Sequence, residues 1–137
     1  MSHFVECQTE FRDPQALIAA LIECGFRADQ IEVHQEAVLL YGYRGDVRPQ
    51  KAHVVIRRQH VGTAAKDVGW ERPPNGTYRS WISEYDQRCR FDPAMQNRIK
   101  QEYAYQVISR QQRARGRSVE RQRLPSGEIE VTIAGYR

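Results

Sequence analysis

The stretch Asp13–Gly25, DPQALIAALIECG, contains a complete set of signals for an α-helix. Asp13 can cap the first turn, and Pro14 follows at the first helical position, where its missing N–H costs nothing. Gly25 stands where helices commonly end. Between them, four apolar residues recur at helical spacing, namely Leu17, Ile18, Leu21 and Ile22. We therefore predict an amphipathic helix over residues 13–24.

A second helix is predicted further along the chain by the same pairing of residues. Asp92-Pro93 again places a capping aspartate before a proline. The apolar positions that follow lie near one face of a helix, and they are Met95, Ile99, Tyr103, Val107 and Ile108. This helix should run from residue 93 to about 115 and stop at Gly116.

The segments around the two helices have the composition of β-strands. The first such runs are 4–11, 31–33, 37–41 and 52–58. Pro73-Pro74-Asn75-Gly76 is a strong turn signal, so a strand within 61–71 and a strand over 77–82 should form a hairpin. The last two runs, 117–123 and 128–133, predict a second hairpin, because the final run alternates strictly between polar and apolar residues.

The order of these elements indicates the fold class. Strands and helices do not alternate as they do in proteins with parallel sheets. We predict an α+β fold in two layers, an antiparallel sheet with two helices on one face. A length of 137 residues suits one hydrophobic core. We therefore predict a single domain over residues 1–137 that ends in a C-terminal hairpin at about 117–134.

The positive charge of the chain is concentrated in one segment. The net charge is +4, and the acidic Glu120 stands among six arginines, namely Arg110, Arg113, Arg115, Arg117, Arg121 and Arg123. We call these six residues the arginine segment. Arg110, Arg113 and Arg117 share one face if the helix persists, and guanidinium groups can bind phosphate oxygens in pairs. The alternative interpretation is a solvated helix end, where cations complement the helix dipole.

The sequence contains no recognisable catalytic or metal-binding motif. The four histidines, His3, His34, His53 and His60, form no zinc-binding pattern, and there is no P-loop or nucleophile elbow. We therefore predict no catalytic residues, no metal and no cofactor. One candidate pocket remains. It would consist of His53, Trp70 and Tyr78 and would lie at a dimer interface if the chain forms a homo-oligomer.

The cysteines and the apolar runs indicate a cytoplasmic location. Cys7, Cys24 and Cys89 are too few and too scattered for a disulfide framework, and Cys7 and Cys24 have the apolar neighbours of buried thiols. No apolar run approaches the roughly 20 residues of a membrane helix, so we expect no contact with a membrane. The first residues do not have the pattern of a secretory signal.

Several segments together resemble one protein family. They are the opening Met1-Ser2-His3-Phe4, the first helix ending at Gly25-Phe26, Tyr43-Arg44-Gly45 before Ala52-His53-Val54-Val55-Ile56, Asp67-Val68-Gly69-Trp70 and Gln101-Glu102-Tyr103-Ala104-Tyr105. In this order they are similar to the family called conserved chloroplast reading frame thirty-five, or domain of unknown function twelve fifty-seven. The resemblance covers nearly the whole chain. It implies an accessory role, because some members are encoded beside AAA-type ATPases or in phage genomes.

Three functional hypotheses follow. The first is a non-enzymatic accessory protein that binds a protein partner through surfaces such as the arginine segment, and the resemblance suggests an AAA-type ATPase as that partner. The second is a nucleic-acid-binding module that uses the same arginines. The third is a small enzyme whose pocket, at a dimer interface, contains His53, Trp70 and Tyr78. We expect the protein not to be an enzyme.

Overall fold

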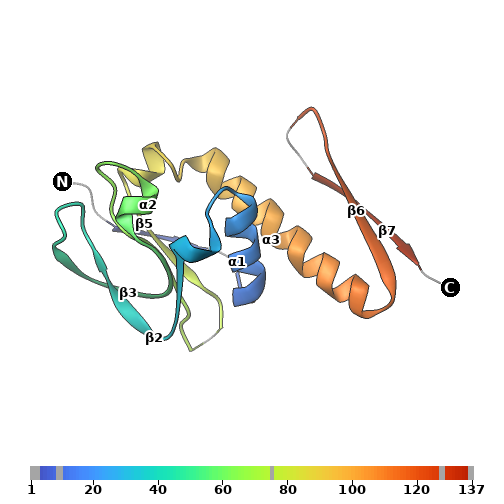
Figure 1. Ribbon diagram of the computed structural model, residues 1–137, viewed down its shortest axis with the longest axis horizontal. Coiled ribbons are helices and arrows are strands. Elements are labelled where there is room, and N and C mark those ends of the chain that lie inside the picture. Colours follow the sequence, from blue (N-terminus) through green and yellow to red (C-terminus); the bar gives the residue numbers. More distant parts are fainter. Residues whose placement is uncertain (1–3, 9–10, 75, 127–128, 136–137) are drawn as a thin grey trace.

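The main sheet of the protein has five antiparallel strands in the order β1-β5-β4-β3-β2 (Figure 1). The computed structural model describes residues 4–8, 11–74, 76–126 and 129–135. The strands of this sheet are β1 (Phe4–Gln8), β2 (Ile31–Tyr41), β3 (Val47–Ile56), β4 (Val68–Glu71) and β5 (Arg79–Ser83). The helices are α1 (Pro14–Glu23), the short α2 (Arg58–Val61) and α3 (Pro93–Ala114), with 3₁₀ turns η1 (Ala28–Gln30) and η2 (Asp86–Arg88).

Both long helices begin and end as the sequence predicts. The Asp13 carboxylate accepts hydrogen bonds from the backbone N–H groups of Gln15 and Ala16, at 2.9 and 3.2 Å. The Asp92 carboxylate caps α3 in the same way. Gly25 and Gly116 follow the helices with φ of +109° and +74°, a conformation that favours glycine. None of the helices in the described ranges is long and apolar enough to cross a membrane.

The two long helices cover one face of the main sheet. Leu17 and Leu21 of α1 and Ile99 of α3 belong to the same buried cluster as the sheet residues, which include Val54, Ile56, Val68, Trp70 and Ile82. The aromatic rings of Phe26 and Phe91 stack within this cluster, with centroids 5.6 Å apart. Cys24 is buried there as predicted. The predicted α+β fold with two layers is confirmed.

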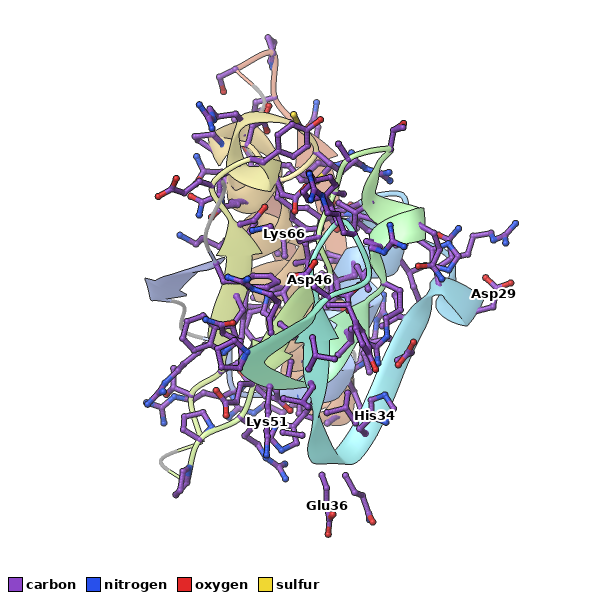
Figure 2. All side chains as sticks on the ribbon, turned by 90° about the vertical axis from the view of Figure 1, so that its left-hand side faces the viewer. Asp29, His34, Glu36, Asp46, Lys51 and Lys66 are labelled. Atoms are coloured by element: carbon purple, nitrogen blue, oxygen red, sulfur yellow. The ribbon has the colours of Figure 1, made fainter. Side chains whose placement is uncertain are left out.

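The opposite face of the sheet carries a smaller buried cluster. Phe4, Leu40, Ala52 and Val55 form it. Strand β2 contains an irregularity between Val33 and Val38, and Figure 2 shows the strand bending sharply near His34 and Glu36. This bend brings the second half of β2 and the first half of β3 over the sheet, where Leu40 and Ala52 lie on Gly69 of β4.

Two strand predictions were wrong in their bounds. The runs 31–33 and 37–41 form one bulged strand, because pairing with β3 spans both. Strand β3 starts earlier than 52–58 and ends at Ile56, since residues 58–61 turn into α2. The strand predicted within 61–71 is confirmed and consists of Val68–Glu71. The predicted hairpin of β4 and β5 is confirmed by their antiparallel pairing.

The last two strands form a sheet of their own. Strands β6 (Arg117–Arg123) and β7 (Ile129–Gly135) pair only with each other in the described chain. This hairpin follows the end of α3 that lies away from the main sheet (Figure 1). Val119 is buried, and Arg121 reaches Glu102 of α3. The alternation of polar and apolar residues predicts that the apolar side of β7 is buried. Ile133 on this side is 44% exposed, so the burial is incomplete.

The close packing on Gly69 gives a test of the fold. A Cβ atom at this position would lie 2.5 Å from the Cβ of Ala52, so Gly69→Ala forces the two layers of backbone apart. Overpacking of this kind typically costs about 1–3 kcal/mol. Urea unfolding should therefore show a lower free energy of unfolding.

Gly62→Ala is the matched control for this change. A Cβ at Gly62 would make an ordinary contact of 3.8 Å with the Cβ of Ala65. Its backbone φ of 173° is extended and suits any residue. If both variants unfold at the same urea concentration as the original chain, the packing on Gly69 is not as described.

Candidate functional site

A pocket of about 530 Å³ opens beside the turn that joins β2 to β3. Its volume lies in the range of small-molecule sites in proteins. We call it the Tyr43–Tyr85 pocket. Three separate segments contribute its lining residues, which are Tyr43, Arg44, Asp46, Arg48, Ala64, Lys66 and Tyr85.

The first wall of this pocket is a tight turn. The N–H of Gly42 donates to the backbone oxygen of Asp46 at 2.8 Å, and the N–H of Gly45 donates to the oxygen of Gly42 at 2.9 Å. Gly45 has a φ of +78°, which explains a glycine at this point of the turn. The turn therefore holds Tyr43 and Arg44 at its tip, next to the start of β3.

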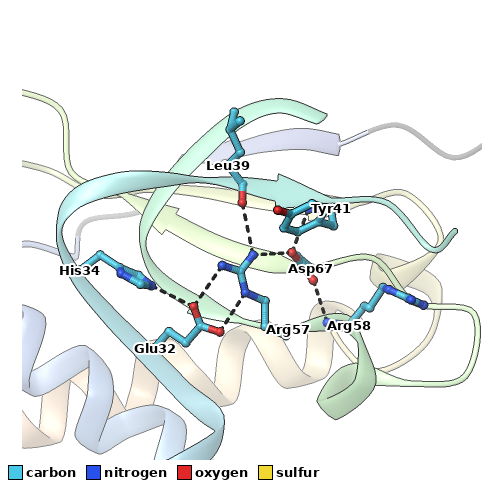
Figure 3. Close-up of polar contacts among 7 residues, drawn as sticks. All are labelled: Glu32, His34, Leu39, Tyr41, Arg57, Arg58 and Asp67. Atoms are coloured by element: carbon cyan, nitrogen blue, oxygen red, sulfur yellow. Dashed lines mark hydrogen bonds and ion pairs between the residues drawn. The ribbon is translucent and has the colours of Figure 1, made fainter. Parts of the chain in front are cut away.

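A buried carboxylate ties this turn to the rest of the sheet (Figure 3). Asp67 is only 1% exposed. Its Oδ1 accepts the backbone N–H of Arg58 at 2.8 Å, and its Oδ2 accepts the N–H of Tyr41 and a guanidinium N–H of Arg57, both at 2.8 Å. These three donors come from α2, from the end of β2 and from the residue after β3. Asp67 thus fixes where three segments meet.

The guanidinium of Arg57 extends this contact into a network. It donates two hydrogen bonds to Glu32, at 2.9 and 3.0 Å, and one to the backbone oxygen of Leu39 at 3.2 Å (Figure 3). A ring nitrogen of His34 lies 2.8 Å from the same Glu32 carboxylate. The Arg57 hydrogen bonds lower the pKa of Glu32, against the opposing effect of burial. Arg57 thus joins the two halves of the bent strand β2, because Glu32 lies before the bend and Leu39 lies after it.

The network reaches the pocket through Arg58. Its guanidinium donates to the backbone oxygen of Tyr43 at 2.8 Å. Because the N–H of Arg58 is itself held by Asp67, the buried carboxylate positions the pocket wall through one intermediate residue. Arg57 and Asp67 are therefore positioning residues and do not line the pocket.

A second buried carboxylate fixes the opposite wall. Asp86 accepts the backbone N–H of Lys66 at 3.1 Å and the hydroxyl of Ser83 at 2.7 Å, both through Oδ2. Burial raises the pKa of Asp86, although these hydrogen bonds oppose the shift. Its Oδ1 is buried and has no hydrogen-bond partner in the described part of the chain. The segment that carries Ala64 and Lys66 is thus anchored on both sides, by Asp67 and Asp86.

Among the residues that line the pocket, cations outnumber carboxylates, although Asp86 and Glu84 also act on the charge of Lys66. Arg44, Arg48 and Lys66 face the single carboxylate of Asp46. Burial lowers the pKa of Lys66, and the neighbouring Arg48 acts in the same direction. Arg48 lies 3.5 Å from the Asp46 carboxylate, while its Nε is buried without a hydrogen-bond partner among the described residues. A pocket with this balance favours an anionic group.

The arginine segment does not form one face. Helix α3 ends at Ala114, so Arg117 lies in β6 and does not share a helix face with Arg110 and Arg113. The glycine at 116 causes this, because it ends the helix. The five arginines of the segment whose side chains are described are all exposed.

The arginines of this segment also differ in their contacts. Arg110 lies 3.6 Å from the Asp13 carboxylate, Arg117 donates to Gln112 at 3.0 Å, and Arg121 pairs with Glu102 and Glu23. Arg113 and Arg115 are exposed and have no ion pair within the described ranges. The side chain of Arg123 lies outside the described residues.

The structure does not bring together His53, Trp70 and Tyr78. His53 and Tyr78 line a smaller pocket of about 230 Å³, where burial lowers the pKa of His53. Trp70 is 1% exposed and pairs across the sheet with Val54. Since successive side chains of a strand point to opposite faces, Trp70 shares the helix-covered face with Val54 and not the face of His53. Two of the three predicted residues, His53 and Tyr78, therefore line one pocket, and Trp70 does not.

Sequence reasoning did not single out the lining of the Tyr43–Tyr85 pocket. The glycines of the segment Gly42–Asp46 favour a turn, but Lys66 and Tyr85 reach this turn only through the tertiary fold. One usable signal was the placement of a tyrosine and an arginine at the tip of a turn, where loops often carry function. In the described ranges no group of three or more His, Cys, Asp or Glu residues could hold a metal ion.

The network around Asp67 predicts the effect of removing Arg57. Arg57→Met leaves the Asp67 carboxylate buried without its cation, and breaking a buried pair in this way costs about 3–5 kcal/mol. The free energy of unfolding in urea should fall by that amount. Arg27→Met is the control, because Arg27 and Asp29 form an exposed pair worth at most about 1 kcal/mol. Equal losses in the two variants would contradict this role of Arg57.

The comparisons with known proteins identify a family but no activity. No curated protein and no solved structure matches the chain. Residues 26–132 match the model of a family described as protein of unknown function (DUF1257). The match includes every residue that lines the Tyr43–Tyr85 pocket. The chain therefore belongs to the family of proteins of unknown function called DUF1257.

Proposed function

We propose that this protein is a non-enzymatic accessory protein, and that the Tyr43–Tyr85 pocket holds an anionic group of the molecule it binds. One observation carries this proposal. Among the described residues that line this pocket of about 530 Å³, three are cations and one is a carboxylate. Clefts lined by one sign of charge concentrate ligands of the opposite sign.

The guanidinium of Arg48 supports the proposal. Its side chain is 26% exposed and lies 3.5 Å from the Asp46 carboxylate. Its terminal N–H groups can donate to an oxygen of a phosphate or carboxylate in the pocket, and a guanidinium can bind two such oxygens at once.

The rigidity of the pocket walls also favours binding. Asp67 and Asp86 are both buried. Asp67 accepts the backbone N–H of Arg58 and Asp86 accepts that of Lys66, so each carboxylate fixes a segment beside the pocket. A site built this way loses little conformational entropy when a ligand enters.

The chemistry of the lining favours binding over catalysis. Its described residues include no serine, cysteine or histidine, so the pocket lacks the pair of a hydroxyl or thiol nucleophile with a histidine base. A hydrogen bond with Cys89 raises the pKa of Tyr85, so its hydroxyl stays protonated at neutral pH and does not supply a tyrosinate base.

Inorganic pyrophosphate and citrate are suitable probes of this proposal. Isothermal titration of the full chain should show binding of at least one of them, and Arg48→Gln should weaken it about tenfold, because one charge-assisted contact is lost. Arg113→Gln removes the same charge from an exposed site outside the pocket and should leave the affinity unchanged. The proposal fails if neither anion binds, or if the two variants weaken binding equally.

A second candidate function is binding of nucleic acid through the arginine segment. Arg113 and Arg115 favour it, because they are neighbouring exposed cations without ion pairs in the described chain. Against it, Arg110 and Arg121 are engaged with acidic side chains. These pairs leave a smaller cationic surface than the sequence suggests.

The salt dependence of oligonucleotide binding tests this second function. For a single strand, each phosphate contact contributes about 0.7 to the slope of log affinity against log salt. Replacing both Arg113 and Arg115 with Ala should lower the slope by up to about 1.4, whereas Arg48→Gln should not change it. An unchanged slope in the double variant would remove nucleic acid as a ligand of this segment.

A further inference from the structure

We infer that the ligand of the Tyr43–Tyr85 pocket is a mononucleotide, a phosphate joined to a planar base. This inference rests on the proposed function and names the class of its ligand. It depends on the two tyrosines of the pocket, which the binding of a simple anion does not use.

The first planar surface of the pocket is formed by Tyr43 and Arg44. The guanidinium carbon of Arg44 lies 5.2 Å from the centroid of the Tyr43 ring, and Nε of Arg44 donates to the Tyr43 hydroxyl at 2.8 Å. The two planar groups therefore hold each other in place at the tip of the turn. Aromatic rings and guanidinium planes are the surfaces on which nucleobases stack.

The second planar surface is the ring of Tyr85. This residue precedes η2. The backbone N–H of Arg88 donates to the backbone oxygen of Tyr85 at 3.0 Å and closes this turn. The hydroxyl of Tyr85 interacts with Cys89 in the same turn. Tyr43 and Tyr85 are each 38% exposed although both line the pocket. Large aromatic surface left open at a pocket is typical of a ligand-binding site.

The cations complete the match to a nucleotide. Arg48 and Lys66 line the same pocket as the two rings, so a phosphate can reach them while its base lies against a tyrosine. The pocket of about 530 Å³ is large enough for a small ligand of this kind. The other pocket, of about 230 Å³ beside His53, falls below the usual size of such sites.

Three probes separate the contributions of base and phosphate. Adenosine 5′-monophosphate, ribose 5-phosphate and adenosine are titrated into the full chain by calorimetry. The nucleotide should bind about tenfold more tightly than ribose 5-phosphate, a difference typical of one base stacked on an aromatic side chain. It should also bind about tenfold more tightly than adenosine, because the phosphate contacts the cations.

Substitutions of Tyr85 identify the stacking surface. Tyr85→Leu should weaken binding of the nucleotide about tenfold and leave ribose 5-phosphate unchanged, while Tyr85→Phe keeps the ring and should keep the affinity. Tyr105→Leu is the matched control, because Tyr105 lies in α3 and packs against Arg121. Circular dichroism of each variant confirms that it is folded.

The outcomes distinguish this inference from the proposed function. If the nucleotide and ribose 5-phosphate bind equally, or if Tyr85→Leu weakens both to the same extent, the base makes no contact and the inference is overturned. The proposed function then still stands on the anion. If neither these ligands nor pyrophosphate nor citrate binds, both proposals are overturned.

Discussion

The buried carboxylate of Asp67 is the interaction on which the region around the pocket depends. A charged group at 1% exposure is stable in a protein only when donors surround it. Asp67 has three, from Tyr41 at the end of β2 and from the consecutive residues Arg57 and Arg58 after β3. The need to satisfy this one carboxylate therefore sets how β2, β3 and the segment before β4 meet. The pocket wall follows from that arrangement.

The same region shows what the residues of one segment that resembles the family do in this chain. In the run Asp67-Val68-Gly69-Trp70, the aspartate binds three donors, and the glycine admits the close approach of Leu40 and Ala52. The two apolar members are buried in the core beneath the helices. Tyr103, from the last of the segments that resemble the family, accepts the backbone N–H groups of Arg12 and Asp13 at 2.8 and 2.9 Å, so it fixes the start of α1. In this chain, these residues set the architecture around α1 and the main sheet.

The helices could be predicted from the sequence because their signals are local. Caps such as Asp13 and Asp92 act on the next few residues only. The bulge of β2 and the short α2 were not predictable in this way, since they depend on pairing and hydrogen bonds with distant segments. The same holds for the pocket, whose lining joins the turn at Tyr43 to Tyr85 through the tertiary fold. The clustering of positive charge in the arginine segment could be seen in the sequence. Gly116 ends the helix within this segment, so Arg117 does not share a helix face with Arg110 and Arg113.

The bend of β2 also affects how copies of the chain meet one another. An edge strand of 11 residues offers unpaired backbone groups on which another molecule can add a strand, the first step of aggregation. The irregularity between Val33 and Val38 interrupts this row, and Glu32, His34 and Glu36 place polar groups near the break. Natural proteins protect sheet edges by such bulges and charges. The bend that folds Leu40 over the sheet therefore also makes this edge a poor template for an added strand.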